Sequence, residues 1–143
     1  MENLTIPDIT QIDSKITITN PTLAQLNQEA DEIQRFMRTT TGITDGNILA
    51  YRLNQMDMYL ARLSEMSITA KAMKKHAEKI FKDANSQQLA EMTATNANRE
   101  LSSFLYEFTQ TADRLETMYG TLNKMSSDLV TQISYLKSIM QIH

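Results

Sequence analysis

The residues that could carry out chemistry are few, and they form no catalytic or metal-binding pattern. The chain has 143 residues, with two histidines, His76 and His143, and no cysteine. A helical metal site needs a second histidine four residues away or a glutamate three residues before the histidine, and neither histidine has such a partner. Without cysteine, disulfides, thiolate metal sites and cysteine nucleophiles are excluded. We therefore expect no metal and no cofactor, and we interpret His76 as a solvated residue or a partner contact.

Nucleophilic and phosphate-binding motifs are also missing. Gly42, Gly46 and Gly120 are the only glycines. They cannot be arranged as a glycine-rich phosphate loop, and no serine lies between two glycines in the nucleophile-elbow pattern. The sequence thus predicts a protein that is not an enzyme.

Two charged segments could contact partners. Between residues 71 and 83 there are five basic residues against two acidic ones, and between residues 1 and 47 there are three basic against seven acidic. Lysines near a helix C-terminus complement the helix dipole, and they could instead contact phosphates of a nucleic acid or nucleotide. The candidate phosphate contacts are Lys71, Lys74, Lys75, Lys79 and Lys82. The candidate acidic contacts to a basic partner are Glu29, Asp31 and Glu32.

The composition favours a helical protein. Apolar residues make up 41% of the chain and aromatic residues 6%, with three glycines and two prolines, so residues that favour tight turns are scarce. We predict an extended N-terminal arm over 1–19 and a single helical domain over 20–143. Asn20 is the expected N-cap of the first helix, with Pro21 at its first position. The expected helices cover about 21–40, 46–83 and 98–141, with a short helix or turn at about 86–95.

The last of these helices has the clearest apolar periodicity. Its apolar residues recur every third or fourth position, as in a coiled coil. They are Leu101, Leu105, Phe108, Leu115, Leu122, Leu129, Ile133 and Leu136. We expect the two long helices to form an antiparallel, coiled-coil-like hairpin, and these residues to form an oligomer seam as well.

Further apolar residues lie off this seam and would be exposed in a single chain. They are Phe104, Met118, Met125, Val130 and Ile139. Because exposed apolar surface favours association, we expect a homodimer or a higher oligomer, with a helical bundle formed on association. Gly120 is expected to allow the close approach of a neighbouring element.

Several short segments resemble small helical proteins of tailed bacteriophages, which are encoded among early recombination and replication genes. The segments are Met58–Leu63, Ala70–Ala72, Ala112–Leu115 and Val130–Leu136. The resemblance implies a phage accessory protein in the cytoplasm of a bacterial host, and it implies no catalytic residue.

Together these observations predict a protein that acts by binding another protein, such as a phage factor that inhibits or modulates a host defence or DNA-processing complex. Two alternatives stay open: a nucleic-acid or nucleotide-binding protein that uses the lysines, and a structural coiled-coil component. No apolar run is long enough to span a membrane, so we expect no membrane partner.

Overall fold

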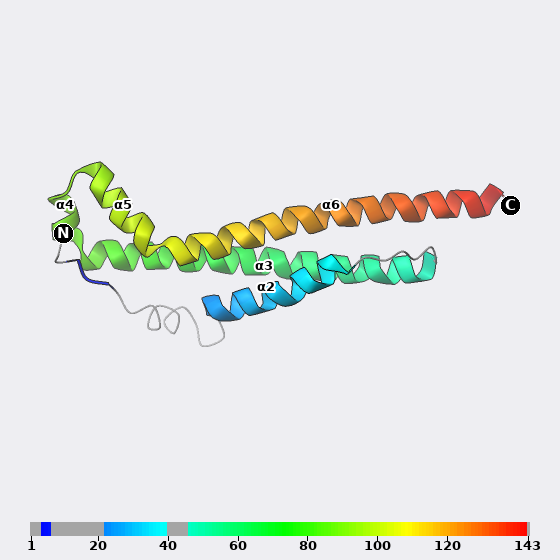
Figure 1. Ribbon diagram of the computed structural model, residues 1–143, viewed down its shortest axis with the longest axis horizontal. Coiled ribbons are helices and arrows are strands. Elements are labelled where there is room, and N and C mark those ends of the chain that lie inside the picture. The colour runs from blue at the N-terminus through cyan, green and yellow to red at the C-terminus, as the bar shows by residue number, and fades with distance from the viewer. Residues whose placement is uncertain (1–3, 7–21, 40–45, 143) are drawn as a thin grey trace.

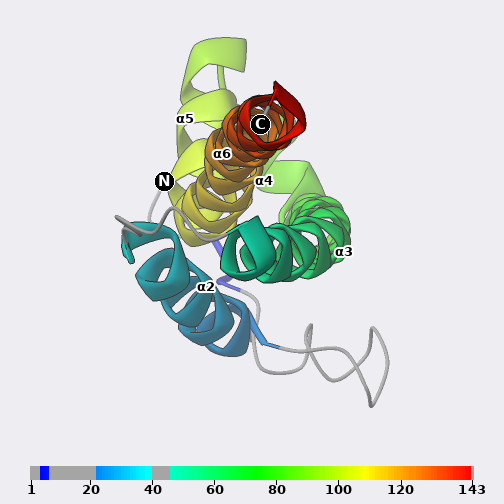
Figure 2. The same cartoon turned by 90° about the vertical axis from the view of Figure 1, so that its right-hand side faces the viewer.

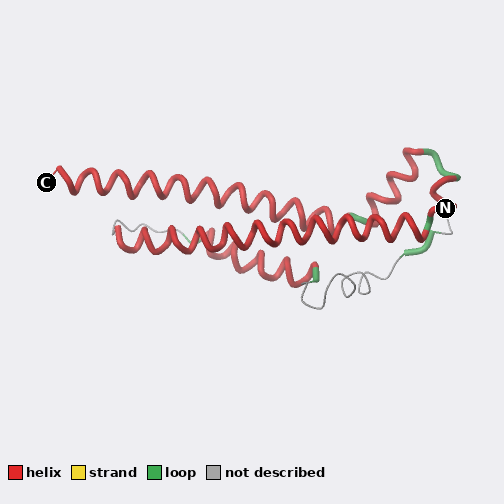
Figure 3. The backbone as a smooth tube through the Cα atoms, turned by 180° about the vertical axis from the view of Figure 1, so that it is seen from behind, coloured by secondary structure: helices red, strands yellow, loops and turns green. Residues whose placement is uncertain are grey.

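The described part of the chain folds entirely into helices and their connections. The structure is a computed structural model that describes residues 4–6, 22–39 and 46–142. Its helices are α2 (Leu23–Arg38), α3 (Gly46–Ala84), α4 (Ser86–Ala90), α5 (Ala94–Phe104) and α6 (Tyr106–Ile142). In the described ranges, Figure 3 shows helices and loops and no strand. The predicted all-α class is confirmed, whereas the predicted arm over 1–19 lies outside the described residues except for Leu4–Ile6.

Two long helices form the body of the molecule. α3 has 39 residues and α6 has 37, and they lie side by side in opposite directions (Figure 1). Each carries buried apolar residues at every third or fourth position, which places them on one face of the helix. Small side chains at Ala70, Ala77 and Ala112 are part of this core, and the separation of packed helices depends on the size of the side chains between them.

α2 begins two residues later than the sequence suggested. Its N-cap is Thr22, whose hydroxyl accepts a hydrogen bond from the Gln25 N–H while the Gln25 side chain accepts one from the Thr22 N–H. This capping box satisfies two backbone donors that the helix itself leaves unpaired. The expected cap at Asn20 is therefore corrected to Thr22, and Asn20 and Pro21 lie outside the described residues.

α2 packs along both long helices. Viewed along the long axis, α2, α3 and α6 lie at the corners of a triangle (Figure 2). The residues of α2 that face the centre are buried: Leu23, Leu26, Ala30 and Ile33. We call this part of the molecule, where α2 accompanies α3 and α6, the three-helix section.

The chain expected to form one helix over 98–141 is interrupted at Leu105. Leu105 has φ −86° and ψ 4°, outside helical values, and it separates α5 from α6. The ring of Phe104 stacks on Phe81 of α3, with centroids 4.6 Å apart, while the Leu105 side chain is buried. These contacts account for the break, since no glycine or proline marks it.

Residues expected to stay exposed on a single chain are largely covered within it. Met118 is buried, Phe104 and Met125 are half-buried against the core, and Ile139 is half-buried, whereas Val130 is exposed. Phe104 stacks on Phe81 of α3, and Met125 lines a hollow with Met37 of α2. Gly120 is exposed, and a Cβ there would meet nothing within 4 Å, so the expected close approach is absent among the described residues.

The last turns of α6 extend beyond the start of α3. Figure 1 shows α6 continuing past the first residue of α3, where α2 no longer accompanies it. The core-facing residues of α6 become progressively exposed along this part, with Leu129 at 6% and Met140 at 76%, and with Ile133 and Leu136 half-buried between them. We call Leu129, Ile133, Leu136 and Met140 the distal stripe. Among the described residues, no helix is long and apolar enough to cross a membrane.

Candidate functional site

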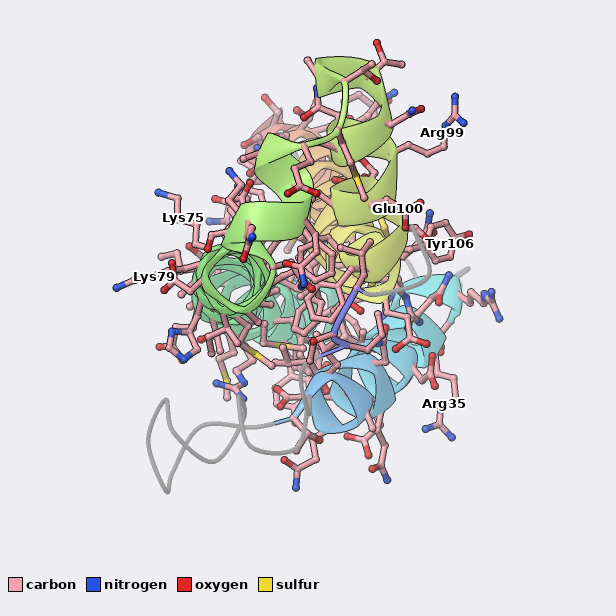
Figure 4. The ribbon with its side chains drawn as sticks, turned by 90° about the vertical axis from the view of Figure 1, so that its left-hand side faces the viewer. Arg35, Lys75, Lys79, Arg99, Glu100 and Tyr106 are labelled. Atoms are coloured by element: carbon pink, nitrogen blue, oxygen red, sulfur yellow. The ribbon has the colours of Figure 1, made fainter. Side chains whose placement is uncertain are left out.

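The five candidate lysines lie on α3, and four of them share its outer face. Lys71, Lys75, Lys79 and Lys82 are exposed, while Lys74 is half-buried. At about 100° per residue the four exposed lysines occupy one arc of the helix, on the side away from the buried Ala70 and Ala77. Figure 4 shows Lys75 and Lys79 pointing outward from α3.

Acidic residues lie next to two of these lysines. The Lys71 Nζ is 3.9 Å from a carboxylate oxygen of Glu116 on α6, and the Lys82 Nζ is 3.4 Å from one of Glu78. Exposed ion pairs of this kind contribute little energy, so they leave the lysines able to change partners. The face is thus a moderately basic surface, in which Lys75 and Lys79 are held by no ion pair with a described residue.

Two of the three candidate acidic residues are already engaged inside the chain. The Glu29 carboxylate forms a bidentate ion pair with Arg62 of α3, and a 2.8 Å hydrogen bond from the guanidinium is one of its two contacts. The hydrogen bond from Arg62 lowers the pKa of Glu29 below its ordinary value. Asp31 accepts a 2.6 Å hydrogen bond from Arg114 of α6. Glu32 is exposed and, unlike Glu29 and Asp31, forms no ion pair with a described residue. It is therefore the acidic residue best placed to meet a partner.

A polar cluster that the sequence did not indicate joins α2 to α6. Arg114 donates to the Asn27 carbonyl at 3.3 Å, to Asn27 Oδ1 at 3.1 Å and to Gln34 Oε1 at 2.9 Å, in addition to Asp31. Asn27 Nδ2 in turn donates to the Thr111 hydroxyl at 2.9 Å. The available signal was the spacing of Asn27, Asp31 and Gln34 by four and three residues, which places them in a polar row beside the apolar row of α2.

The predicted oligomer seam is used mainly inside one chain. Leu105, Phe108, Leu115, Leu122 and Leu129 are buried in the core that α6 forms with α3 and α2. Leu101, Ile133 and Leu136 are half-buried and pack against the same core. Ile133 and Leu136 also belong to the distal stripe, and a contact between copies would use that stripe or other exposed residues.

Histidine, aspartate and glutamate supply the side chains of the described residues that could hold a metal ion. No three histidine, aspartate or glutamate side chains of the described ranges lie close enough to hold a metal ion. His76 is half-buried rather than fully solvated, and its Nε2 atom is buried with no hydrogen-bond partner in the described part of the chain. The hollows between the helices are open and shallow, and the one beside the polar cluster encloses about 520 Å³.

A second unexpected feature lies where α3 ends. Asn85, which follows α3 directly, is completely buried, and its side-chain amide binds the backbone of Thr5 near the N-terminus. Beside it lies an open hollow of about 540 Å³ bordered by Phe81, Phe104, Tyr106 and Glu100. Figure 4 shows Glu100 and Tyr106 on the opposite side of the molecule from Lys75 and Lys79. The sequence placed Asn85 in a polar turn and gave no reason to link it to residues 80 positions earlier.

Comparison with known proteins assigns the chain to no family. No family model matches the chain, and no curated protein and no solved structure shows significant similarity to it.

Proposed function

We propose that the protein is a non-enzymatic helical binding protein that self-associates and engages a protein partner through its surface rather than through a catalytic cleft. The observation that carries the proposal is the distal stripe. It starts at the buried Leu129, which borders a hollow with Met37 of α2, and Ile133, Leu136 and Met140 then continue the spacing of the α6 core with increasing exposure, up to 76% at Met140. Burial of such side chains removes apolar surface from water and favours association.

A second copy is the occupant that fits this surface best. At this end the first turns of α3 lie beside α6 as a pair of helices, and the last turns of α6 extend past this pair (Figure 1). Two copies related by a twofold axis would place two such pairs together and complete a four-helix bundle of coiled-coil type. The partly or largely exposed apolar side chains at this end are Ile133, Leu136 and Met140 of the distal stripe and, on α3, Ile48 and Tyr51.

The test compares two glutamate substitutions within one turn of α6. Met140→Glu places a charge on the distal stripe, and Ser138→Glu places the same charge two residues away, toward the opposite side of the helix. By sedimentation equilibrium, we expect a dimer at micromolar concentration whose dissociation constant rises at least about tenfold with Met140→Glu, equivalent to about 1.4 kcal/mol. Ser138→Glu should leave it unchanged. A wild-type chain that is monomeric at tens of micromolar would refute the self-association.

The proposed partner class follows from the phage resemblance: a host defence or DNA-processing complex with a basic nucleic-acid channel, which the acidic face of α2 would occupy. Because Glu29 and Asp31 bind Arg62 and Arg114, reversing their charge would also disturb the fold. Glu32→Lys is the cleaner test. The control is Gln28→Lys, at an exposed position about one helical turn before Glu32. The measurement is the inhibition of the nucleic-acid-processing activity of the partner complex by each variant. If Glu32→Lys loses this inhibition and Gln28→Lys keeps it, the proposal is supported. If both variants inhibit equally well, the proposal is wrong.

Binding of a nucleic acid is the second candidate, and the common outer face of Lys71, Lys75, Lys79 and Lys82 favours it. Phosphate contacts release counterions, so the affinity should fall steeply with salt. The variant Lys71→Glu/Lys75→Glu/Lys82→Glu should then abolish a salt-dependent fluorescence-anisotropy signal with a short oligonucleotide. Absence of any signal from the wild-type protein at low salt would eliminate this candidate.

A further inference from the structure

The contact between Asn85 and Thr5 has the form of a backbone recognition site. The Thr5 N–H donates to Asn85 Oδ1 at 2.6 Å, and Asn85 Nδ2 donates to the Thr5 carbonyl at 2.9 Å. In a strand, the N–H and the carbonyl of one residue point to the same side, and an antiparallel partner exchanges both bonds with them. The Asn85 amide therefore takes the place of a neighbouring strand.

The amide is held in position for this contact. Its second Nδ2 hydrogen donates to the Phe81 carbonyl at 2.9 Å, and the side chain is 0% exposed. Both Nδ2 donors are thus used, one inside α3 and one by the bound segment. A buried amide without its partner costs about 1–3 kcal/mol, so the site favours an occupant whenever one is available.

The residues on either side of Thr5 indicate that the site prefers a segment with apolar side chains at these two positions. Alternate residues of an extended segment point to the same face. Leu4 and Ile6 accordingly border the same hollow, together with Phe81, Phe104 and Tyr106, and Leu4 is half-buried there while Thr5 and Ile6 are exposed. Because the hydrogen bonds involve only the Thr5 backbone, the identity of the middle residue matters little.

Among the residues that the structure describes, the polar contacts of Leu4–Ile6 with the helices are made by Thr5 alone. Ile6 remains 67% exposed, although it borders the hollow, and the two hydrogen bonds of Thr5 are the polar contacts that tie residues 4–6 to the helices. A contact of this size can open without unfolding the helices, since their core lies elsewhere.

We propose that Asn85 and the hollow beside it form a binding site for an extended peptide with an apolar residue on each side of the one that is held, and that Leu4–Ile6 of the same chain are its resident, exchangeable occupant. The site thus accepts the same sequence supplied as a free peptide once the resident segment is released. While the resident segment is bound, it competes with the peptide and weakens its apparent affinity in proportion to the fraction of empty sites.

The test uses the full-length chain with Thr5→Pro, which removes the N–H that Asn85 Oδ1 accepts and leaves Asn85 intact. The probe is a fluorescein-labelled peptide with the sequence of residues 1–8. We expect it to bind Thr5→Pro at least about tenfold more tightly than the wild type, which corresponds to a resident segment bound about 90% of the time. Thr5→Ala keeps the backbone donor and should behave as the wild type, and a probe with proline at its fifth position should bind none of these proteins.

A second measurement reports on the site directly. In ¹H–¹⁵N spectra, the Asn85 side-chain amide resonances should shift in Thr5→Pro and return toward their wild-type positions when the peptide is added. Equal affinity of the peptide for the wild type and Thr5→Pro, or no binding to Thr5→Pro, would overturn the proposal. If Thr5→Pro instead converts a wild-type dimer into a monomer, the occupant comes from a second copy, and the assignment to the same chain is wrong.

Discussion

The three-helix section and the distal end of α6 share one residue spacing but differ in what covers it. In the three-helix section, Leu115 and Leu122 are completely buried, and the polar cluster of Arg114 fixes α2 in place. In the distal stripe, Leu136 is half-buried and Met140 is largely exposed. Periodicity therefore identifies the apolar face of a helix, while the number of neighbouring helices decides whether that face becomes a core or remains available.

The largest expected effect tests this difference directly. Leu115→Ala should lower the free energy of unfolding by about 2–5 kcal/mol, because it creates a cavity between closely packed helices. Leu136→Ala, the same substitution in the distal stripe, should cost about half as much or less, because water already reaches that site. Urea denaturation followed by circular dichroism measures both. Equal losses would mean that the two regions are equally well packed.

The next effect concerns the attachment of α2. Arg114→Met keeps most of the aliphatic stem but removes the hydrogen bonds to Asn27, Asp31 and Gln34, and we expect a loss of about 1–2 kcal/mol. Arg99→Met on the exposed face of α5 is the control and should change little. Hydrogen exchange should accelerate in α2 while the centres of α3 and α6 stay protected. Uniform acceleration over all three helices would show that α2 does not open independently.

A smaller, stabilising effect is expected on the outer face of α6. Gly120→Ala should raise the free energy of unfolding by about 0.8–1 kcal/mol, because alanine favours a helix interior more than glycine does and the site has open space. Gly46→Ala, at the first residue of α3, should give a smaller gain. If Gly120→Ala weakened self-association instead, the face around Gly120 would be a close contact between copies. The association surface would then extend beyond the distal stripe.

The smallest effect is a pH dependence of the three-helix section. The ordinary pKa of Glu29 is near 4.5, and the hydrogen bond from Arg62 lowers it in the folded chain. The ion pair therefore stabilises the fold above pH about 4.5, and this contribution is lost as the pH falls through the lowered pKa. The pair is partly exposed, so the contribution is roughly 0.2–1 kcal/mol. Glu29→Gln should flatten the stability profile below pH 5 relative to the wild type, and an unchanged profile would contradict the assignment.

Much of the helical architecture could be predicted from the sequence, because the core rows of α3 and α6 recur every third or fourth residue and few glycines or prolines interrupt them. The break at Leu105 could not, since it depends on the stacking of Phe104 on Phe81, which are far apart in the chain. The N-cap was misplaced because Asn20-Pro21 and Thr22 are both favourable starts, and the reciprocal bonds of Thr22 with Gln25 favour the later one.

The candidate sites were less predictable for a related reason. The sequence reveals which residues are charged, but the ion pairs of Glu29 with Arg62 and of Asp31 with Arg114 join residues 33 and 83 positions apart. The same holds for Asn85, whose polar type suggested a solvated turn. Its complete burial follows only from the placement of residues 4–6 and α5 around the end of α3.

The binding of Thr5 to Asn85 also has a consequence for the order of events during synthesis. Thr5 leaves the ribosome before its partner, which is made 80 residues later. At roughly 5–20 residues per second, the N-terminal segment remains unbound for about 4–16 s in each round of translation. During that interval a neighbouring nascent or finished chain could offer its own Asn85, so the rate of translation would influence whether the segment joins its own chain or another one.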